Sequence, residues 1–121
     1  MLCPCQSGLS FEDCCSPALS GISWPQTPEK LMRSRYTAYA LKNVDWLVET
    51  WAESERDSLD FFALEEELKN LEYTGLKILE ARGDRVSFEA RHREAGGRGG
   101  RLKENSRFIQ KDGRWYYLND Q

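Results

Sequence analysis

The chain has 121 residues, of which 40% are hydrophobic and 12% aromatic, and this composition favours one packed domain with a small appendage over a disordered chain. Its net charge of −3 is uneven, since residues 82–114 hold 10 basic and 5 acidic side chains. No run approaches the roughly 20 apolar residues of a membrane span, and no secretory pattern opens the chain. We therefore expect a cytoplasmic protein with reduced thiols and no membrane partner.

The first twenty residues contain all four cysteines, in the pattern C-x-C-x8-C-C: Cys3, Cys5, Cys14 and Cys15. A segment this short and poor in large apolar side chains needs a cross-link or a metal to hold a shape. Zinc prefers four thiolate or imidazole ligands in a closed tetrahedron, and two close pairs joined by a short loop can supply them. The spacing indicates one structural Zn²⁺ with no open coordination position.

Several alternatives to a zinc site involve the same thiols. A disulfide between Cys14 and Cys15 would be strained, because neighbouring α-carbons lie about 3.8 Å apart and disulfides usually span about 4.4–6.8 Å. Cross-pair disulfides after oxidation in air, a redox role and another metal stay open.

Residues 21–27 have the composition of a linker, and a helix is predicted from Pro28 to about Lys42. Thr27 can cap its free N–H groups, and proline suits its first turn. The apolar stripe of this helix would contain Leu31, Met32, Tyr36 and Tyr39. A short second helix, capped by Asn43 or Asp45, and a third helix over residues 57–70 should follow.

From residue 73 onward the period of the apolar residues changes from that of a helix to that of a strand. Strands are predicted over residues 73–82, around the alternating Val86, Phe88 and Ala90, over 102–111 and over 114–119, with a hairpin turn at residues 112–113. Helices followed by an antiparallel sheet define an α+β class, in which a curved sheet wraps the long helix.

The glycine-rich segment 94–101 should form a flexible hairpin tip. It also resembles arginine–glycine segments that contact RNA, so RNA binding through the Arg91 to Arg107 surface is a minor alternative.

The segment from Cys3 to Cys15 resembles the SEC-C motif, the zinc-binding element at the tail of the bacterial translocation ATPase SecA. That resemblance implies Zn²⁺ on the four cysteines and the docking of a protein or ribosomal partner through Gln6, Leu9, Ser10 and Glu12. The motif usually has glycine where this chain has Gln6.

Residues 31–40, 104–108 and 112–118 are similar to the YchJ-like family of uncharacterised bacterial proteins. The resemblance implies a zinc knuckle (1–20), a linker (21–27) and a nuclear-transport-factor-like α+β cone (28–121). The family often has histidine where this chain has Ala52.

Cone-shaped folds of this class often enclose a pocket that serves enzymes and binding modules alike. Aromatic residues combined with arginine would suit an anionic or planar ligand. The candidate lining residues are Arg35, Tyr36, Tyr39, Trp46, Trp51, Arg107, Trp115 and Tyr117. The alternative is that these aromatic residues fill the core and that Arg35 pairs with a carboxylate at its rim.

Catalytic residues are not indicated. His92 is the single histidine and has no evident nucleophile or acid beside it, so we expect a structural or surface role. Phosphate-binding loops and hydrolase or metalloprotease motifs are absent from the sequence. The leading hypothesis is a non-enzymatic zinc-binding interaction module, and the alternative is a small-molecule binder or enzyme that uses the cone pocket. The sequence does not determine the oligomeric state.

Overall fold

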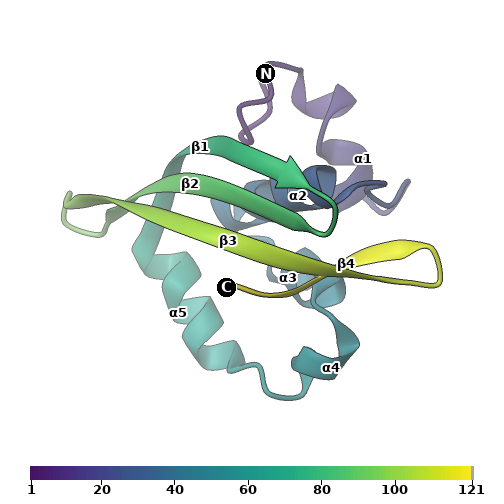
Figure 1. Ribbon diagram of the computed structural model, residues 1–121. Coiled ribbons are helices and arrows are strands. Elements are labelled where there is room, and N and C mark those ends of the chain that lie inside the picture. Colours follow the sequence, from purple (N-terminus) through teal and green to yellow (C-terminus); the bar gives the residue numbers. More distant parts are fainter. Residues whose placement is uncertain (121) are drawn as a thin grey trace.

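A computed structural model describes residues 1–120, so Gln121, the last residue of the expected cone, lies outside the described residues. Helices precede a four-stranded antiparallel sheet, which confirms the expected α+β order (Figure 1). The helices are η1 (Phe11–Asp13), α1 (Ser16–Leu19), α2 (Pro28–Leu41), α3 (Val44–Thr50), α4 (Glu53–Arg56) and α5 (Phe61–Asn70). The strands are β1 (Leu71–Arg82), β2 (Arg85–Glu94), β3 (Gly99–Lys111) and β4 (Arg114–Asp120), and each pairs with the next. Within residues 1–120, none of the helices has the length and hydropathy to cross a bilayer.

The boundaries of α2 follow from its end residues. The Thr27 side chain accepts the backbone N–H of Lys30, and Pro28 occupies the first turn, as expected. At the other end Lys42 adopts a left-handed conformation (φ 61°), and its N–H closes the helix onto the carbonyls of Ala38 and Tyr39. The Lys42 ammonium also donates to the carbonyl of Leu68, which ties this end to α5.

Asn43 caps α3 by accepting the N–H of Trp46, which confirms one of the two expected caps. The helix expected over residues 57–70 is confirmed as α5, but it begins only at Phe61, and the short helix α4 precedes it. Asp60 stands between them and accepts the N–H of Ala63 at 2.9 Å, because a free carboxylate satisfies the unpaired donors of a first turn.

The sheet is longer than expected because its pairing continues into the glycine-rich segment. Gly99 and Gly100 of β3 pair with Arg93 and His92 of β2, so the turn itself spans only residues 95–98. A Cβ atom on Gly100 would lie 2.8 Å from the His92 ring, so a larger residue there would force this imidazole to move. His92 thus has a packing role near the end of β2, next to the β2–β3 turn.

The sheet curves around α2, and register irregularities in β1 and between Arg107 and Phe108 of β3 increase that curvature. The inward side chains Val86, Phe88 and Ala90 are at most 5% exposed, which confirms the predicted alternation. They pack with Leu31 of α2 and with Phe108 in one core. Figure 1 shows α2 behind the sheet, with the N-terminal segment beside it above β1 and with α5 at the opposite end.

Residues 21–27 contain an anchor rather than only linker residues. The Trp24 ring lies 5.1 Å from that of Trp46 and 5.2 Å from that of Tyr116, and its indole N–H donates to the carbonyl of Trp115 at 2.9 Å. Arg114 covers the same ring at 4.7 Å. The segment is therefore pinned to α3 and β4 and positions the first twenty residues.

We expect Trp24→Ala to lower the free energy of unfolding by about 2 kcal/mol, less than a fully buried tryptophan because Trp24 is half-buried. Ile22→Ala is the control in the same segment, since Ile22 is 80% exposed and its truncation should change stability by less than about 0.5 kcal/mol. Urea unfolding of both variants measures the difference. Equal stabilities would show that the indole does not anchor the segment.

Candidate metal centre and inner cavity

The sulfur atoms of Cys3, Cys5, Cys14 and Cys15, here called the cysteine cluster, all lie within 4.8 Å of one another. The Cys5 and Cys14 sulfurs are 3.6 Å apart, and those of Cys14 and Cys15 are 3.9 Å apart. Four thiolates at about 2.3 Å from one zinc ion stand about 3.8 Å from each other, so the cluster has the dimensions of a tetrahedral metal site. All four thiols are free of disulfides.

A short hairpin and a 3-10 turn bring the two cysteine pairs together. Residues Leu2 and Ser10 form a bridge, and the N–H of Cys3 donates to the carbonyl of Leu9. Gln6, at the position where the motif usually has glycine, has φ 62°, a left-handed conformation that costs a side chain about 1–2 kcal/mol. Its amide reaches the Thr74 carbonyl of β1 at 3.4 Å, so the side chain offers a contact that glycine lacks.

Hydrogen-bond donors surround the sulfur atoms. The hydroxyls of Ser7 and Thr37 lie 3.2 Å from Cys14 Sγ and 3.3 Å from Cys15 Sγ. One turn earlier in α2, the Arg33 guanidinium donates to the Cys5 carbonyl at 2.9 Å and lies 3.9 Å from the Cys5 sulfur. Such donors offset the negative charge of metal-bound thiolates and orient the ligands.

The protonation of the thiols also favours a cation in the cluster. The hydrogen bond from Cys15 lowers the pKa of Cys5 to about 4, against the effect of burial. Burial raises the pKa of Cys14, and the hydrogen bond to Cys5 together with burial raises that of Cys15. One thiolate thus suppresses ionisation of its neighbours, and four can coexist only around a cation. The donor set fits a thiolate-binding metal.

A second feature lies between α2 and the sheet, a cavity of about 230 Å³ here called the inner cavity. Five of the eight expected pocket residues line it, namely Arg35, Tyr36, Tyr39, Trp51 and Tyr117. Its remaining lining residues are Met32, Glu67, Tyr73, Phe88, Ala90, Leu102, Glu104, Ser106 and Asp120. Strand alternation could have revealed Glu104, because it lies between Leu102 and Ser106 on the inward face of β3. Asp120 and Glu67 carried no such signal.

The other three expected residues do not line the inner cavity. Trp46 is buried beneath Trp24, and its indole N–H donates to Ser34 Oγ at 3.0 Å. Arg107 points outward from β3 and faces Asp84 at 3.7 Å, because it alternates with the buried Ser106. The side chain of Trp115 is half-buried at the edge of the core and does not border the cavity.

Arg35 is only 3% exposed, and among residues 1–120 its hydrogen-bond partners are a carbonyl and a hydroxyl rather than a carboxylate. Its Nη1 donates to the Leu47 carbonyl at 2.9 Å and to the Thr50 hydroxyl at 2.6 Å. Its guanidinium carbon lies 4.5 Å and 4.4 Å from the ring centres of Trp51 and Tyr117. Burial lowers the pKa of Arg35, but an arginine still stays protonated in a protein.

Carboxyl groups form the polar part of the inner cavity. Glu67 accepts the Tyr73 hydroxyl at 2.8 Å, and Asp120 accepts the Ser106 hydroxyl at 2.8 Å. Burial, and then the hydrogen bond with Asp120, raise the pKa of Glu104 to about 8. The lining therefore holds a carboxyl that is largely protonated at neutral pH.

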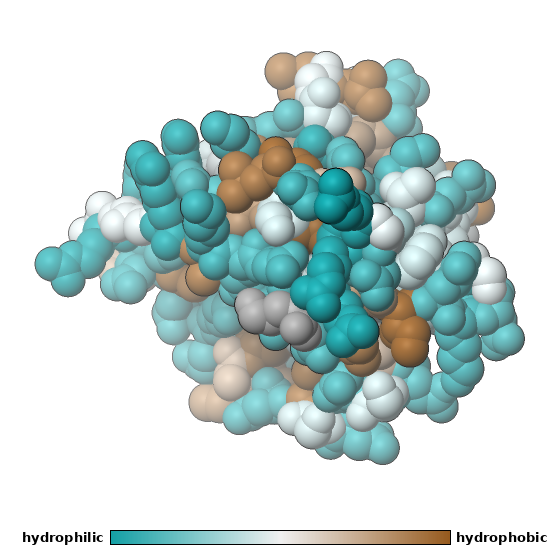
Figure 2. Space-filling view, viewed as in Figure 1, coloured by the Kyte–Doolittle hydropathy of each residue, from teal (hydrophilic) through white to brown (hydrophobic). Residues whose placement is uncertain are grey.

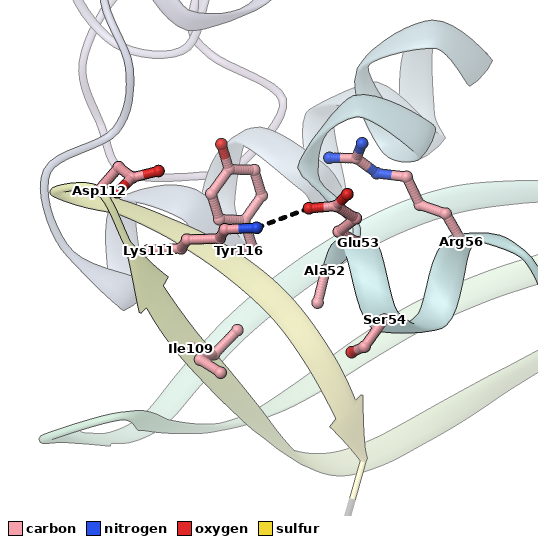
Figure 3. Close-up of a pocket in the computed structure, with 8 residues that line it drawn as sticks. All are labelled: Ala52, Glu53, Ser54, Arg56, Ile109, Lys111, Asp112 and Tyr116. Atoms are coloured by element: carbon pink, nitrogen blue, oxygen red, sulfur yellow. Dashed lines mark hydrogen bonds and ion pairs between the residues drawn. The ribbon is translucent and has the colours of Figure 1, made fainter.

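A wider groove of about 620 Å³ lies between α4 and the β3–β4 hairpin (Figure 3). Its ion pair joins Lys111 to Glu53 at 2.6 Å, but both side chains are more than half exposed, and a solvated pair contributes little. Ala52, at the position where the family often has histidine, also borders this groove. The groove contains no buried titratable side chain among its lining residues.

The chain resembles known proteins over its whole described length. A family model described as the middle NTF2-like domain of YchJ matches residues 27–120, and the SEC-C motif model matches residues 2–17. A UPF0225 protein of Deinococcus radiodurans is 44% identical over 118 residues, which are 97% of this chain and 86% of that protein.

Two solved structures have the same fold. The solution structure of a SEC-C motif containing protein from Rhodopseudomonas palustris has a TM-score of 0.90 at 38% identity, over 100% of this chain and 98% of that one. The crystal structure of a SEC-C motif containing protein from Psychrobacter arcticus has a TM-score of 0.79 at 26% identity, over 97% and 80% of the two chains. The nuclear-transport-factor-like cone is thereby confirmed.

We expect Cys14→Ser to lower the zinc content of the purified chain several-fold, because the cluster loses one of four ligands. Amides of residues 1–20 should then exchange rapidly with solvent, while those of β2 and β3 stay protected. Metal analysis and hydrogen exchange measure both effects, and Asp13→Asn, an exposed neighbour, is the control. Unfolding of the whole chain would show that the cluster and the cone cannot separate.

The raised pKa of Glu104 makes the stability depend on pH in a defined direction. Between its ordinary value of 4.5 and about 8 the folded state binds more protons than the unfolded state, so stability falls as pH rises through this window. Glu104→Gln removes this loss. We expect a smaller decrease in melting temperature between pH 6 and pH 8 in that variant than in the metal-loaded wild type. Exposed Glu80→Gln is the control, and parallel curves for all three proteins would contradict the assignment.

Proposed function

This chain belongs to the YchJ-like family and carries a SEC-C motif, and we propose that it is a zinc-containing, non-enzymatic module that docks a protein partner through this motif. Zinc fits the donor set because four thiolates complete its preferred tetrahedron. A site closed in this way has no position for a reacting water or substrate, so the metal serves structure. Reduced thiols require a reducing compartment, which favours the cytoplasm.

The observation that supports docking is a groove of about 410 Å³ between the SEC-C motif and α2, here called the motif groove. Its wall includes two of the four proposed metal ligands, Cys14 and Cys15. The remaining lining residues are Leu9, Asp13, Pro17, Ala18, Ser23, Trp24, Pro25, Gln26, Lys30, Arg33 and Ser34. Because the cysteines form part of the groove, metal binding would set its shape.

The lining residues indicate the chemistry of the partner. Leu9, Pro17 and Trp24 offer apolar surface for a side chain of the partner. Lys30 is exposed at the same groove, so its ammonium can meet a carboxylate of the partner. An extended protein segment with an apolar residue next to an acidic one fits this combination.

Exposed apolar residues continue from the groove onto the outer face of the motif. Met1, Leu2 and Leu9 are 79%, 69% and 53% exposed. Figure 2 shows apolar atoms at the top of the molecule, where Figure 1 places the N-terminal segment. Of the docking residues expected from the motif, Gln6, Leu9 and Glu12 are exposed, while Ser10 is half-buried and caps η1. Large exposed apolar side chains in one place favour an interaction surface.

We expect Leu9→Asp to abolish capture of the partner from a native lysate by the zinc-loaded full chain, because it places a charge in the apolar groove. Phe62→Asp is the matched control, since Phe62 is 73% exposed on α5 and does not line the groove. A purified partner should bind Leu9→Asp at least tenfold more weakly than wild type, about 1.4 kcal/mol. Isothermal titration calorimetry measures this ratio.

The capture experiment also distinguishes a protein partner from RNA or the ribosome. Nuclease-sensitive capture, or sedimentation of the chain with ribosomal subunits in a Leu9-independent manner, would assign binding to RNA or the ribosome and overturn the groove. Identical partners for wild type and Leu9→Asp would end the proposal. Retention of the partner after zinc removal would separate docking from the metal.

A further inference from the structure

The inner cavity is a separate site from the motif groove, and its lining suits a small ligand rather than a protein partner. Aromatic rings from four elements surround it, with Tyr73 5.4 Å from Tyr39 and 6.0 Å from Tyr36 at one part of the wall. Phe88 and Leu102 add apolar surface from β2 and β3. Glu67, Leu102 and Asp120 are exposed at its rim, so a small molecule has a path from solvent.

The arginine in this cavity is already engaged. The carbonyl of Leu47 and the hydroxyl of Thr50 accept from its Nη1, and the rings of Trp51 and Tyr117 cover the guanidinium. An anionic ligand would therefore meet a cation whose faces are covered, together with three carboxyl groups. This argues against the anionic ligand that the sequence suggested.

The charges of the lining are not balanced. Among the described lining residues, the carboxyl groups of Glu67, Glu104 and Asp120 share the cavity with one basic side chain, that of Arg35. Burial and the neighbouring Asp120 carboxyl raise the pKa of Glu104 to about 8, so Glu104 holds a proton at neutral pH. A positive charge brought into the cavity would replace that proton.

We propose that the inner cavity binds a small organic monocation, a primary or methylated ammonium with a short apolar chain. The tyrosine rings would hold the cation and its chain, and the Glu104–Asp120 pair would carry the countercharge. A volume of about 230 Å³ admits an alkylammonium of a few carbon atoms and excludes a nucleotide.

Binding is coupled to the release of a proton from Glu104, so affinity rises with pH. The titratable groups that interact with Glu104 are Tyr39 of α2, Glu67 of α5, Tyr73 of β1, and Tyr117 and Asp120 of β4, while Arg35 of α2 lines the same cavity. The tyrosine hydroxyls stay protonated, because burial raises the pKa of Tyr39, Tyr73 and Tyr117. The group that titrates between pH 6 and pH 8.5 in this cavity is therefore Glu104.

The test uses three probes of equal chain length with the zinc-loaded full chain: n-butylammonium, n-butanol and n-butyrate. Amide resonances of α2, β3 and β4 are followed by NMR during each titration at pH 6 and at pH 8.5. We expect saturable shifts with butylammonium alone, at concentrations on the order of 1–10 mM, and at least tenfold tighter binding at pH 8.5. Glu104→Gln should lose this pH dependence, and exposed Glu80→Gln should keep it.

Each outcome decides the proposal. Butyrate that binds as tightly as butylammonium would show that Arg35 sets the preference and would overturn it. Equal binding of butanol and butylammonium would show that only apolar contact matters. Absence of shifts at these amides with all three probes would show that the cavity takes no such ligand. None of these results depends on the motif groove.

Discussion

Helix α2 is covered on two sides, and both candidate sites depend on that burial. Arg33 and Thr37, four residues apart, approach the cysteine cluster, while Arg35 and Tyr39, also four apart, line the inner cavity. Residues separated by four share a helix face, and residues separated by two point to nearly opposite sides. One helix therefore sets the orientation of the metal centre and of the cavity at once. Leu31 and Ala38, both fully buried, fix the helix between them.

The buried guanidinium of Arg35 holds α2, α3 and β4 together at one end of the domain. A charge removed from water costs several kcal/mol unless its surroundings compensate. Here a carbonyl and a hydroxyl of α3 and the rings of Trp51 and Tyr117 provide that compensation. The same contacts join α2 to α3 and β4, and the Ala52 N–H bonded to the Tyr117 carbonyl at 2.7 Å continues the junction. The residue is thus part of the architecture as well as of the cavity wall.

The cysteine cluster is not an independent appendage. Cys3, Cys5 and Cys15 are almost fully buried and belong to the same core as Leu31 and Tyr36 of α2. The free energy of metal binding is then partly free energy of folding of the motif, because Arg33 and Thr37 of α2 contact the sulfur atoms. Gln6 strengthens this connection through its contact with β1, at the cost of a left-handed backbone.

The sequence by itself determined the features that depend on residues close together in the chain, namely helix caps, turns and the cysteine cluster. Thr27 and Pro28 begin α2, Asn43 begins α3, and Asp112 and Gly113, with φ of 52° and 81°, form the expected hairpin turn. The spacing of the four cysteines likewise predicted a cluster. These signals succeed because a cap, a turn or a close ligand pair involves residues only a few positions apart.

The tertiary structure alone decided which distant side chains meet. The role of Trp24 as an anchor, the separation of Arg107 from the cavity and the pairing of Glu104 with Asp120 have no local signal. They follow from the curvature of the sheet around α2, which the irregularity between Arg107 and Phe108 increases by shifting the strand register. The helix or strand that a residue belongs to determines which way its side chain points. Which distant side chain it then contacts depends on how that element packs against the rest of the chain.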